Sequence, residues 1–306
     1  MSNQRIVIHI GYPKCASSWL QQVMFADEQT GFLAAWGAKS KEVKKQFVNS
    51  DNSSFNADEV RRVYNIGLQA ANQNNLVPVL SNEHLSGNLA NIGWKQEVAD
   101  RLYSTFPEAK IIIIVREQKS ILLSAYGQCI KLGRTLTIEE FLGSIQKGHE
   151  TADNLKRPTF KLDFVKYDLL IEYYQNVFSK ENVLVLPFEL LKKDSKKFAQ
   201  AILDFSGSNG SLPKNKVAKN RGYRGGSLII KRRLNILFPL YNRMGIQVTG
   251  KLSAAADKMI PSSFHERIEN RWKQYIEQRV GNYFHLSNQR TSRLIGINLA
   301  DFGYDC

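Results

Sequence analysis

The sequence predicts an α/β protein in which a parallel sheet is covered by helices, and two observations support this prediction. Short segments rich in Val and Ile recur along the chain, and each is bounded by polar or turn residues. Near-continuous apolar runs of this length are typical of parallel strands buried on both faces. The segments between these runs have helical periodicity, and strands that alternate with helices indicate βαβ units.

The elements follow one another in a regular order. The expected strands are "RIVIHI" (5–10), "LVPVLS" (76–81), "KIIIIV" (110–115) and "NVLVLPF" (182–188). Helical patterns cover 17–26, 57–73, 94–105, 119–131 and 164–178, and two further helices with basic faces are expected at 227–245 and 262–280. Ligands bind such sheets at the carboxyl ends of the strands, so the residues directly after each strand are the candidates for chemistry.

Length and composition favour one domain. The chain has 306 residues, of which 43% are hydrophobic, so it can bury a sizeable core. We expect a single domain over 1–306 with a basic helical C-terminal portion around 225–285. Three widely spaced cysteines indicate neither a disulfide framework nor a zinc site. Without a signal-peptide pattern or an apolar run of membrane-spanning length, a cytoplasmic location is expected.

The charge is strongly positive and unevenly distributed. The net charge is +14, and residues 221–280 hold twelve Lys or Arg against four Asp or Glu. This concentration implies an anionic partner, although a solvated basic face is the simpler alternative. The stretch "SLIIKRRLNILFPLYNRMG" (227–245) could lie on an anionic membrane, for example the inner face of the cell membrane. The alternative is a core-packing helix with a basic outer face.

A phosphate-binding loop is indicated by "GYPKCASSWLQQ" (11–22), directly after the first strand. Gly11 permits a tight turn. Ser17 and Ser18 fall where the next helix should begin, and their hydroxyls together with the free N–H groups of that turn can hold a phosphate. Lys14 adds a positive charge. The alternative is an ordinary helix cap with a surface lysine.

Cys15 raises the question of a phosphatase-type nucleophile. Such a loop needs an arginine a few residues on to close the cradle, and Gln21 and Gln22 stand there instead. A position near a helix N-terminus would still favour its thiolate. We interpret Cys15 as a small loop residue.

Two other strands are also followed by polar residues. In "VREQKSILLSAY", Arg116 ends a strand and Ser124 lies eight residues on, so a guanidinium and a hydroxyl could grip a second phosphate. Taken alone, a capping arginine and a helical serine explain this pair better. In "VLSNEHLSG", Glu83 and His84 directly follow the second strand and are candidates for a general base. A helix N-terminal acid stabilised by the helix dipole is the alternative.

These segments together resemble the sulfotransferase family. The loop "GYPKCASSWL" resembles the 5′-phosphosulfate loop of that family, and "VREQKSILLS" resembles its 3′-phosphate motif with the same Arg-to-Ser spacing. The segments "YDLLIEYYQNVFSKENVLVLPFELLKKD" and "SNQRTSRLIGINLADFGYDC" are also similar to bacterial members. The resemblance covers nearly the whole chain and is weakest around 30–70 and 225–285. It implies a fold related to that of P-loop kinases.

The resemblance implies 3′-phosphoadenosine 5′-phosphosulfate (PAPS) as co-substrate and no metal. It assigns Lys14 to the bridging oxygen and the leaving phosphate. Trp19 would stack on adenine, or it is a core residue of its helix. The other residues implied to bind the nucleotide are Gly11, Pro13, Cys15, Ala16, Ser17 and Ser18 in the loop, Arg116 and Ser124 at the 3′-phosphate, and Arg221 and Gly222 in a late loop. For "AKNRGYRGG" (218–226), which also holds Arg224, a flexible basic linker is the alternative. Cys15 and Ala16 stand where many relatives have a small residue and a glycine.

The resemblance also bears on the base and the acceptor. Glycan sulfotransferases commonly use a glutamate here, whereas cytosolic aryl and steroid enzymes use a histidine. "LSNEHLSG" looks like the Ser-x-Glu-x-Leu-Ser pattern of bacterial members, which favours Glu83 over His84 as the base. The acceptor is then a hydroxyl of a carbohydrate or glycolipid, and no nucleic-acid partner is expected. The rival hypotheses are a nucleotide or sugar kinase and a polyanion-binding protein.

Overall fold

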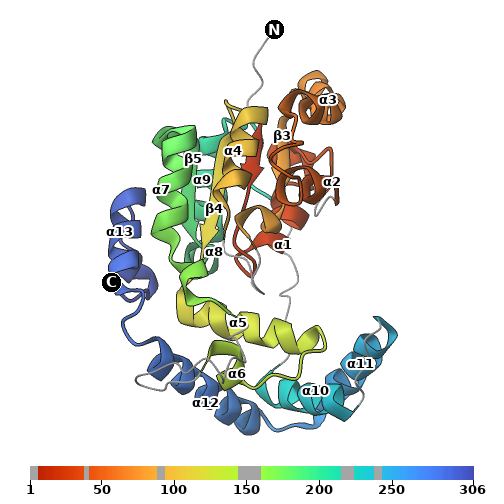
Figure 1. Cartoon of the computed structure of the whole chain (residues 1–306), viewed down its shortest axis with the longest axis vertical. Helices are drawn as coiled ribbons and strands as arrows, with labels where there is room; N and C mark the ends of the chain where they lie inside the picture. The colour runs from red at the N-terminus through yellow and green to blue at the C-terminus, as the bar shows by residue number, and fades with distance from the viewer. Residues whose placement is uncertain (1–5, 38–40, 88–93, 144–159, 215–223, 238–242) are drawn as a thin grey trace. The chain divides into compact units, whose positions relative to one another are not determined.

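The computed structural model describes residues 6–37, 41–87, 94–143, 160–214, 224–237 and 243–306 (Figure 1). The chain divides into two compact units. The first comprises Met1–Glu117, Asp163–Ala218 and Phe284–Cys306, and the second comprises Gln118–Leu162 and Lys219–Tyr283. Each unit is described separately below. The organisation as a single domain stays a prediction.

The first unit is built on a five-stranded parallel sheet. Its strands are β1 (Val7–His9), β2 (Phe32–Leu33), β3 (Val77–Ser81), β4 (Lys110–Val115) and β5 (Val183–Pro187), in the order β2-β3-β1-β4-β5. Every neighbouring pair is parallel, which confirms the predicted fold class and the four expected strands. The fifth, β2, has two residues and is too short to produce a pattern in the sequence. The central position of β1 brings the loop that follows it to the middle of the sheet's carboxyl edge (Figure 1).

The apolar runs form the core of this unit. In β4, Ile111–Val115 are wholly buried, and β1 is buried throughout. Burial of each large aliphatic side chain contributes roughly 1.5–3 kcal/mol, which explains why these runs form strands covered on both faces. The helix α7 (Tyr167–Phe178) packs against β4 and β5, and α3 (Ala57–Gln73) packs against β3.

The remaining helices of the first unit include two within the predicted ranges 17–26 and 94–105 and four that the sequence analysis did not predict. They are α1 (Ser17–Trp19), α2 (Lys41–Val43), α4 (Gln96–Thr105), α8 (Phe188–Lys193), α9 (Ser195–Ser206) and α13 (His285–Ile295). The start of α3 is fixed by Asn56, whose side-chain oxygen accepts hydrogen bonds from the N–H groups of Asp58 (3.0 Å) and Glu59 (3.2 Å). The predicted helix 17–26 is shorter and irregular, because α1 continues into a π-helical turn at Leu20–Met24. Such turns are rare and often lie beside functional sites.

The second unit is helical throughout its described residues. It contains α5 (Gln118–Lys131), α6 (Ile138–Leu142), α10 (Gly225–Leu237), α11 (Arg243–Met259) and α12 (Ser262–Val280). The helix α10 packs against α5, α11 and α12 (Figure 1). Aromatic rings join these helices, with Tyr126 edge-on to Trp272 at 5.2 Å between ring centroids. None of the described helices is long and apolar enough to cross a membrane.

The basic face expected on 227–245 is only partly correct. The helix α10 ends at Leu237 and α11 begins at Arg243, and residues 238–242 lie outside the described residues. Lys231 is buried between these two helices, where its ammonium donates to Thr249 Oγ at 2.5 Å. Burial lowers the pKa of Lys231 because desolvation disfavours the charged form. Lys231 was counted with the outward basic residues because α11 covers this face only in the tertiary structure.

Candidate active site

The loop after β1 makes a tight turn at Pro13 and Lys14. The Cys15 N–H donates to the Tyr12 carbonyl oxygen at 3.2 Å, and Lys14 has a φ of 71°. Proline at the first corner and a positive φ at the second are typical of a type II turn, whose second corner is usually glycine. Ala16 is also left-handed, with a φ of 58°. A left-handed backbone costs a residue with a Cβ roughly 1–3 kcal/mol, and such strain clusters at functional sites.

Gly11 is required by a close neighbour. Its φ is not positive, and the left-handed residues of the loop are Lys14 and Ala16. A Cβ at Gly11 would lie 2.2 Å from Nε2 of the His9 ring. Gly11 was expected to permit a tight turn, and the structure gives a different reason, because the turn itself lies two residues further on.

The buried side chain of His9, on β1, lies directly before the loop and is hydrogen-bonded to β3. His9 Nδ1 lies 2.8 Å from Ser81 Oγ at the end of β3, and Gln21 Nε2 donates to the same oxygen at 3.1 Å. Burial lowers the pKa of His9 to about 3. The neutral ring therefore joins β1, β3 and the start of the following helix.

The turn after β3 is tied to the same loop. Ser86 Oγ lies within donor distance of two carbonyl oxygens, at 2.9 Å from Gly11 and 3.1 Å from Glu83. The Asn82 side chain caps this turn by accepting from the His84 N–H at 3.0 Å. Glu83 and His84, the two candidate bases, thus sit half-buried on a short 3-10 helix anchored to the loop.

The surroundings of Cys15 show which charges gather around the loop. Burial raises the pKa of this thiol; Arg116 and Lys14 act in the opposite direction, and Glu189 and Glu83 raise the pKa further. A buried thiol with a raised pKa is a poor nucleophile, which agrees with the interpretation of Cys15 as a small loop residue. Glu83 is thus one of the charged groups that act on the loop, and its role as the base stays a prediction.

The start of α1 holds a hydroxyl suited to a ligand. Ser17 is buried, and among the described residues its Oγ has no hydrogen-bond partner. A buried polar atom without a partner costs about 1–3 kcal/mol, so its presence beside a strained loop is consistent with a bound anion. Ser18 is half-buried next to it. The N-cap residue is Ala16, whose side chain cannot accept a hydrogen bond from the first N–H groups of the helix, and such groups can bind a phosphate.

Arg116 brings two of the expected nucleotide-binding segments together. Its Nη1 donates to the Lys14 carbonyl oxygen at 3.1 Å, across 102 positions of sequence. Its backbone is held by Tyr167, whose hydroxyl donates to the Arg116 carbonyl at 2.5 Å. Arg116 Nε is buried, and no partner for it lies among the described residues. The guanidinium is therefore fixed beside the loop with hydrogen-bonding capacity left over.

A half-buried carboxylate lies at the same edge and was missed by the sequence analysis. Glu189 Oε2 accepts from the Tyr304 hydroxyl at 3.0 Å, and Oε1 accepts from the Glu117 N–H at 3.4 Å. Burial raises the pKa of Glu189, and these hydrogen bonds oppose that shift. The available signal was position, because Glu189 comes two residues after β5 ends.

The other predicted site residues are less well defined by the structure. Trp19 is half-buried and edge-on to Phe198 at 5.8 Å between centroids, so both interpretations of it stay predictions. Ser124 lies half-buried in α5 of the second unit, and its pairing with Arg116 stays a prediction. Arg221 and Gly222 lie outside the described residues, whereas Arg224 directly precedes α10.

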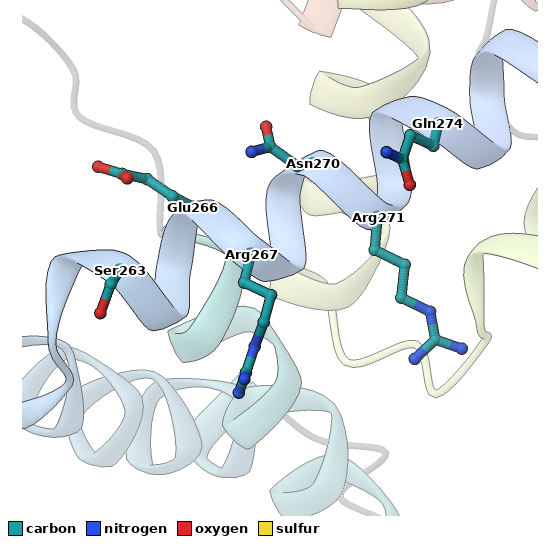
Figure 2. A pocket seen from close by; sticks show the side chains of 6 residues that line it. All are labelled: Ser263, Glu266, Arg267, Asn270, Arg271 and Gln274. Carbon is teal, nitrogen blue, oxygen red and sulfur yellow. The ribbon is translucent and has the colours of Figure 1, made fainter.

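The second unit has a polar hollow of about 490 Å³ along α12. Figure 2 shows Arg267 and Arg271, one turn apart, projecting from the same side of the helix. The full lining is Ser263, Glu266, Arg267, Asn270, Arg271 and Gln274. All six residues belong to one helix, so the hollow is an open basic face, and its chemistry resembles that of a solvated surface more than that of a reaction site.

The architecture and the loop define a class of protein. A parallel sheet with β1 at its centre, a strained loop and helix start after β1, and a guanidinium at the end of β4 are typical of α/β proteins that bind phosphate groups. Comparisons with known proteins narrow this class.

A family model described as a sulfotransferase domain matches residues 4–221, so the chain belongs to the sulfotransferase family. Its fold is similar to the crystal structure of a sulfotransferase from Alicyclobacillus acidocaldarius, with a TM-score of 0.54 and 16% identity over 98% of this chain and 99% of that one. A search of curated proteins found no match. The protein is thus a transferase whose family carries out sulfuryl transfer, as the sequence resemblance indicated.

Proposed function

We propose that the protein transfers the sulfuryl group of PAPS to a hydroxyl of a carbohydrate or glycolipid by in-line displacement. The observation that carries this proposal is the hydrogen bond between Arg116 and the Lys14 carbonyl, because it joins the two segments expected to bind the 5′- and 3′-phosphates. The identity of the donor follows from the family resemblance.

The described residues fit this nucleotide chemically. PAPS presents many anionic oxygens and therefore needs donors. Ser17 Oγ and Arg116 Nε are buried donors without a partner among the described residues, and a phosphate oxygen would satisfy each of them. The left-handed Ala16 directly precedes the helical turn of Ser17, and successive N–H groups in such a geometry form an anion-binding concavity.

Lys14 stabilises the leaving group in this mechanism. As the bond to sulfur breaks, negative charge grows on the departing phosphate, and an ammonium at this position neutralises it. The turn holds Lys14 in a left-handed conformation, and the guanidinium of Arg116 fixes its carbonyl. This preorganisation means that little rearrangement is needed when the charge develops.

Glu83 removes the acceptor's proton. A sugar hydroxyl has a high pKa, so its attack on sulfur requires a base that takes the proton in the transition state. The Glu83 carboxylate lies on a turn anchored to the loop by Ser86, and the proton ends on one of its oxygens. His84 then helps to bind the acceptor or faces away from it.

Nucleotide binding tests this proposal without knowledge of the acceptor. Adenosine 3′,5′-bisphosphate should raise the melting temperature, and AMP should raise it far less, because AMP lacks the phosphate expected at Arg116. Loss of a charge-assisted contact costs roughly 1.5–3 kcal/mol, or about ten- to a hundred-fold in affinity. Equal shifts with both nucleotides would contradict the assignment.

The acceptor class needs a second experiment. Incubation with radiolabelled PAPS and a panel of glycans, glycolipids and phenols, followed by mass identification of the product, should give sulfated sugar. A chelator should leave the reaction intact, whereas a kinase would stop without magnesium.

A further inference from the structure

Two cations pack against one aromatic ring at the edge of the first unit. The Phe188 ring lies 5.0 Å from Arg116 Cζ and 4.7 Å from Lys192 Nζ, measured to the ring centroid. Phe188 is the first residue after β5, and Lys192 follows it by one helical turn in α8. Cations are attracted to an aromatic ring, so Phe188 contacts both groups and keeps each of them near it.

This arrangement concentrates positive charge. The pKa of Lys192 is lowered first by partial loss of solvent and then by the charge of Arg116, while Glu189 and Glu117 act in the opposite direction. The Glu189 carboxylate already accepts from Tyr304 and from the Glu117 N–H. Among the ion pairs found between described residues, neither Arg116 nor Lys192 has a carboxylate partner.

A group with about two negative charges is attracted to both cations. A phosphate monoester carries roughly −1.5 to −2 at pH 7 and presents three acceptor oxygens. Arg116 already uses one N–H on the Lys14 carbonyl, so its fork is not wholly available. A second cation on the same ring supplies the missing charge, and a lysine does so as a mobile point charge.

We infer that Lys192 is a second cationic ligand of the nucleotide's 3′-phosphate, held beside Arg116 by the ring of Phe188. This inference rests on the proposed function. It assigns to Lys192 part of the selection between nucleotides that carry a 3′-phosphate and those that do not. The contribution is electrostatic, and it therefore weakens as ionic strength rises.

The neighbouring Lys193 provides a matched control. It occupies the same last turn of α8, and its ammonium packs against a different ring, 5.9 Å from the centroid of Phe302. Lys192→Met and Lys193→Met remove the same charge from the same helix end and keep a flexible apolar stem. Lys192→Arg keeps the charge and tests rescue.

The experiment is calorimetric titration of the four proteins with adenosine 3′,5′-bisphosphate and with AMP. We expect Lys192→Met to weaken the bisphosphate roughly tenfold and to leave AMP within twofold, a contrast that shrinks at high salt. Lys193→Met should change neither nucleotide beyond twofold, and Lys192→Arg should restore most of the bisphosphate affinity.

Two results would overturn the inference: equal effects of Lys192→Met and Lys193→Met, or an equal loss of bisphosphate and AMP by Lys192→Met. Melting temperatures without ligand check folding, and Lys192→Met should not be the less stable of the two because it relieves repulsion with Arg116. If the wild-type protein itself fails to prefer the bisphosphate, the proposed function fails, which is a separate outcome from failure of Lys192 alone.

Discussion

The two units treat charge in different ways. In the first unit, charged groups at the carboxyl edge of the sheet are held by hydrogen bonds: the Arg116 guanidinium donates to the Lys14 carbonyl, and the Glu189 carboxylate accepts from Tyr304. In the second unit, Arg267 and Arg271 stand on an open face of α12 (Figure 2). Charged side chains held in one position can stabilise charge at one atom of a bound ligand. Exposed charges on a helix surface instead attract anionic partners through their summed electrostatic potential.

Apolar groups differ in the same sense. The first unit buries rings such as Tyr12, which packs edge-on to Tyr167 at 4.8 Å between centroids, and its exposed apolar residues are spread over several helices, for example Ile66 on α3 and Leu286 on α13. In the second unit, Val248, Leu252 and Met259 are exposed along one face of α11, and Lys251 and Lys258 flank them. This difference predicts that substitutions at the site in the first unit change turnover, and that substitutions on the exposed face of α11 in the second unit change binding to anionic membranes.

The largest expected effect concerns the base in the first unit. Glu83→Gln keeps the shape of the side chain but cannot accept a proton, so turnover should fall roughly 10²–10⁴-fold. Affinity for adenosine 3′,5′-bisphosphate should stay nearly unchanged. His84→Asn should cost much less. The measurement is kcat for both variants with one acceptor. A severe His84→Asn with a mild Glu83→Gln would reverse the assignment and favour an aryl-type mechanism.

The next effect concerns the leaving group. Lys14→Ala should lower kcat about 10²–10³-fold, because the charge that it stabilises appears mainly in the transition state. Alanine has the same Cβ as lysine, so the left-handed backbone at this position is equally strained in both proteins. Arg134→Ala in the second unit is the charge-matched control and should be nearly neutral. A rise in KM without a fall in kcat would show that Lys14 only binds substrate.

A smaller effect concerns the pH dependence of stability and a buried histidine of the first unit. The pKa of His9 falls from its ordinary value near 6.5 to about 3 on folding, so the folded state resists protonation. Its contribution to stability is complete above about pH 6.5 and is lost as the pH falls from there toward 3. The slope is about 1.4 kcal/mol per pH unit, so the loss at pH 5 is about 2 kcal/mol.

Urea unfolding of the wild type and of His9→Gln at pH 7.5 and pH 5 measures the contribution of His9 to the pH dependence of the unfolding free energy. The drop in unfolding free energy between the two pH values should be smaller in His9→Gln by about 2 kcal/mol. His285→Gln, at a partly exposed position, should behave like the wild type. The same drop in all three proteins would show that His9 can take up a proton in the folded state.

The smallest effect concerns surfaces. We expect the protein to float with anionic liposomes at low salt and to be released at high salt, through the apolar stripe of α11 and its lysines. Leu252→Asp should reduce flotation several-fold. Leu286→Asp, at an exposed leucine of α13 in the first unit, is the matched control and should leave flotation unchanged. Absence of flotation at low salt would remove the membrane hypothesis.

Sequence patterns alone located four of the five strands and the candidate phosphate-binding loop. A short run of Ile and Val such as 110–115 strongly favours a buried strand, and alternation of such runs with helical segments favours a parallel sheet. The loop was recognisable because its residues act locally, through a turn at Pro13 and Lys14 and a helix start at Ser17. At β5 the same rule points to Glu189, two residues after the strand, which the sequence analysis did not single out.

Contacts between groups that are distant in the sequence depend on tertiary packing. Arg116 meets the Lys14 carbonyl, His9 fills the space that Gly11 leaves, and Lys231 turns inward toward Thr249. No periodic pattern in the sequence reveals these contacts, because they depend on the packed three-dimensional arrangement of the chain. Local patterns report the free energy of one element at a time, whereas these contacts depend on how the elements pack against one another.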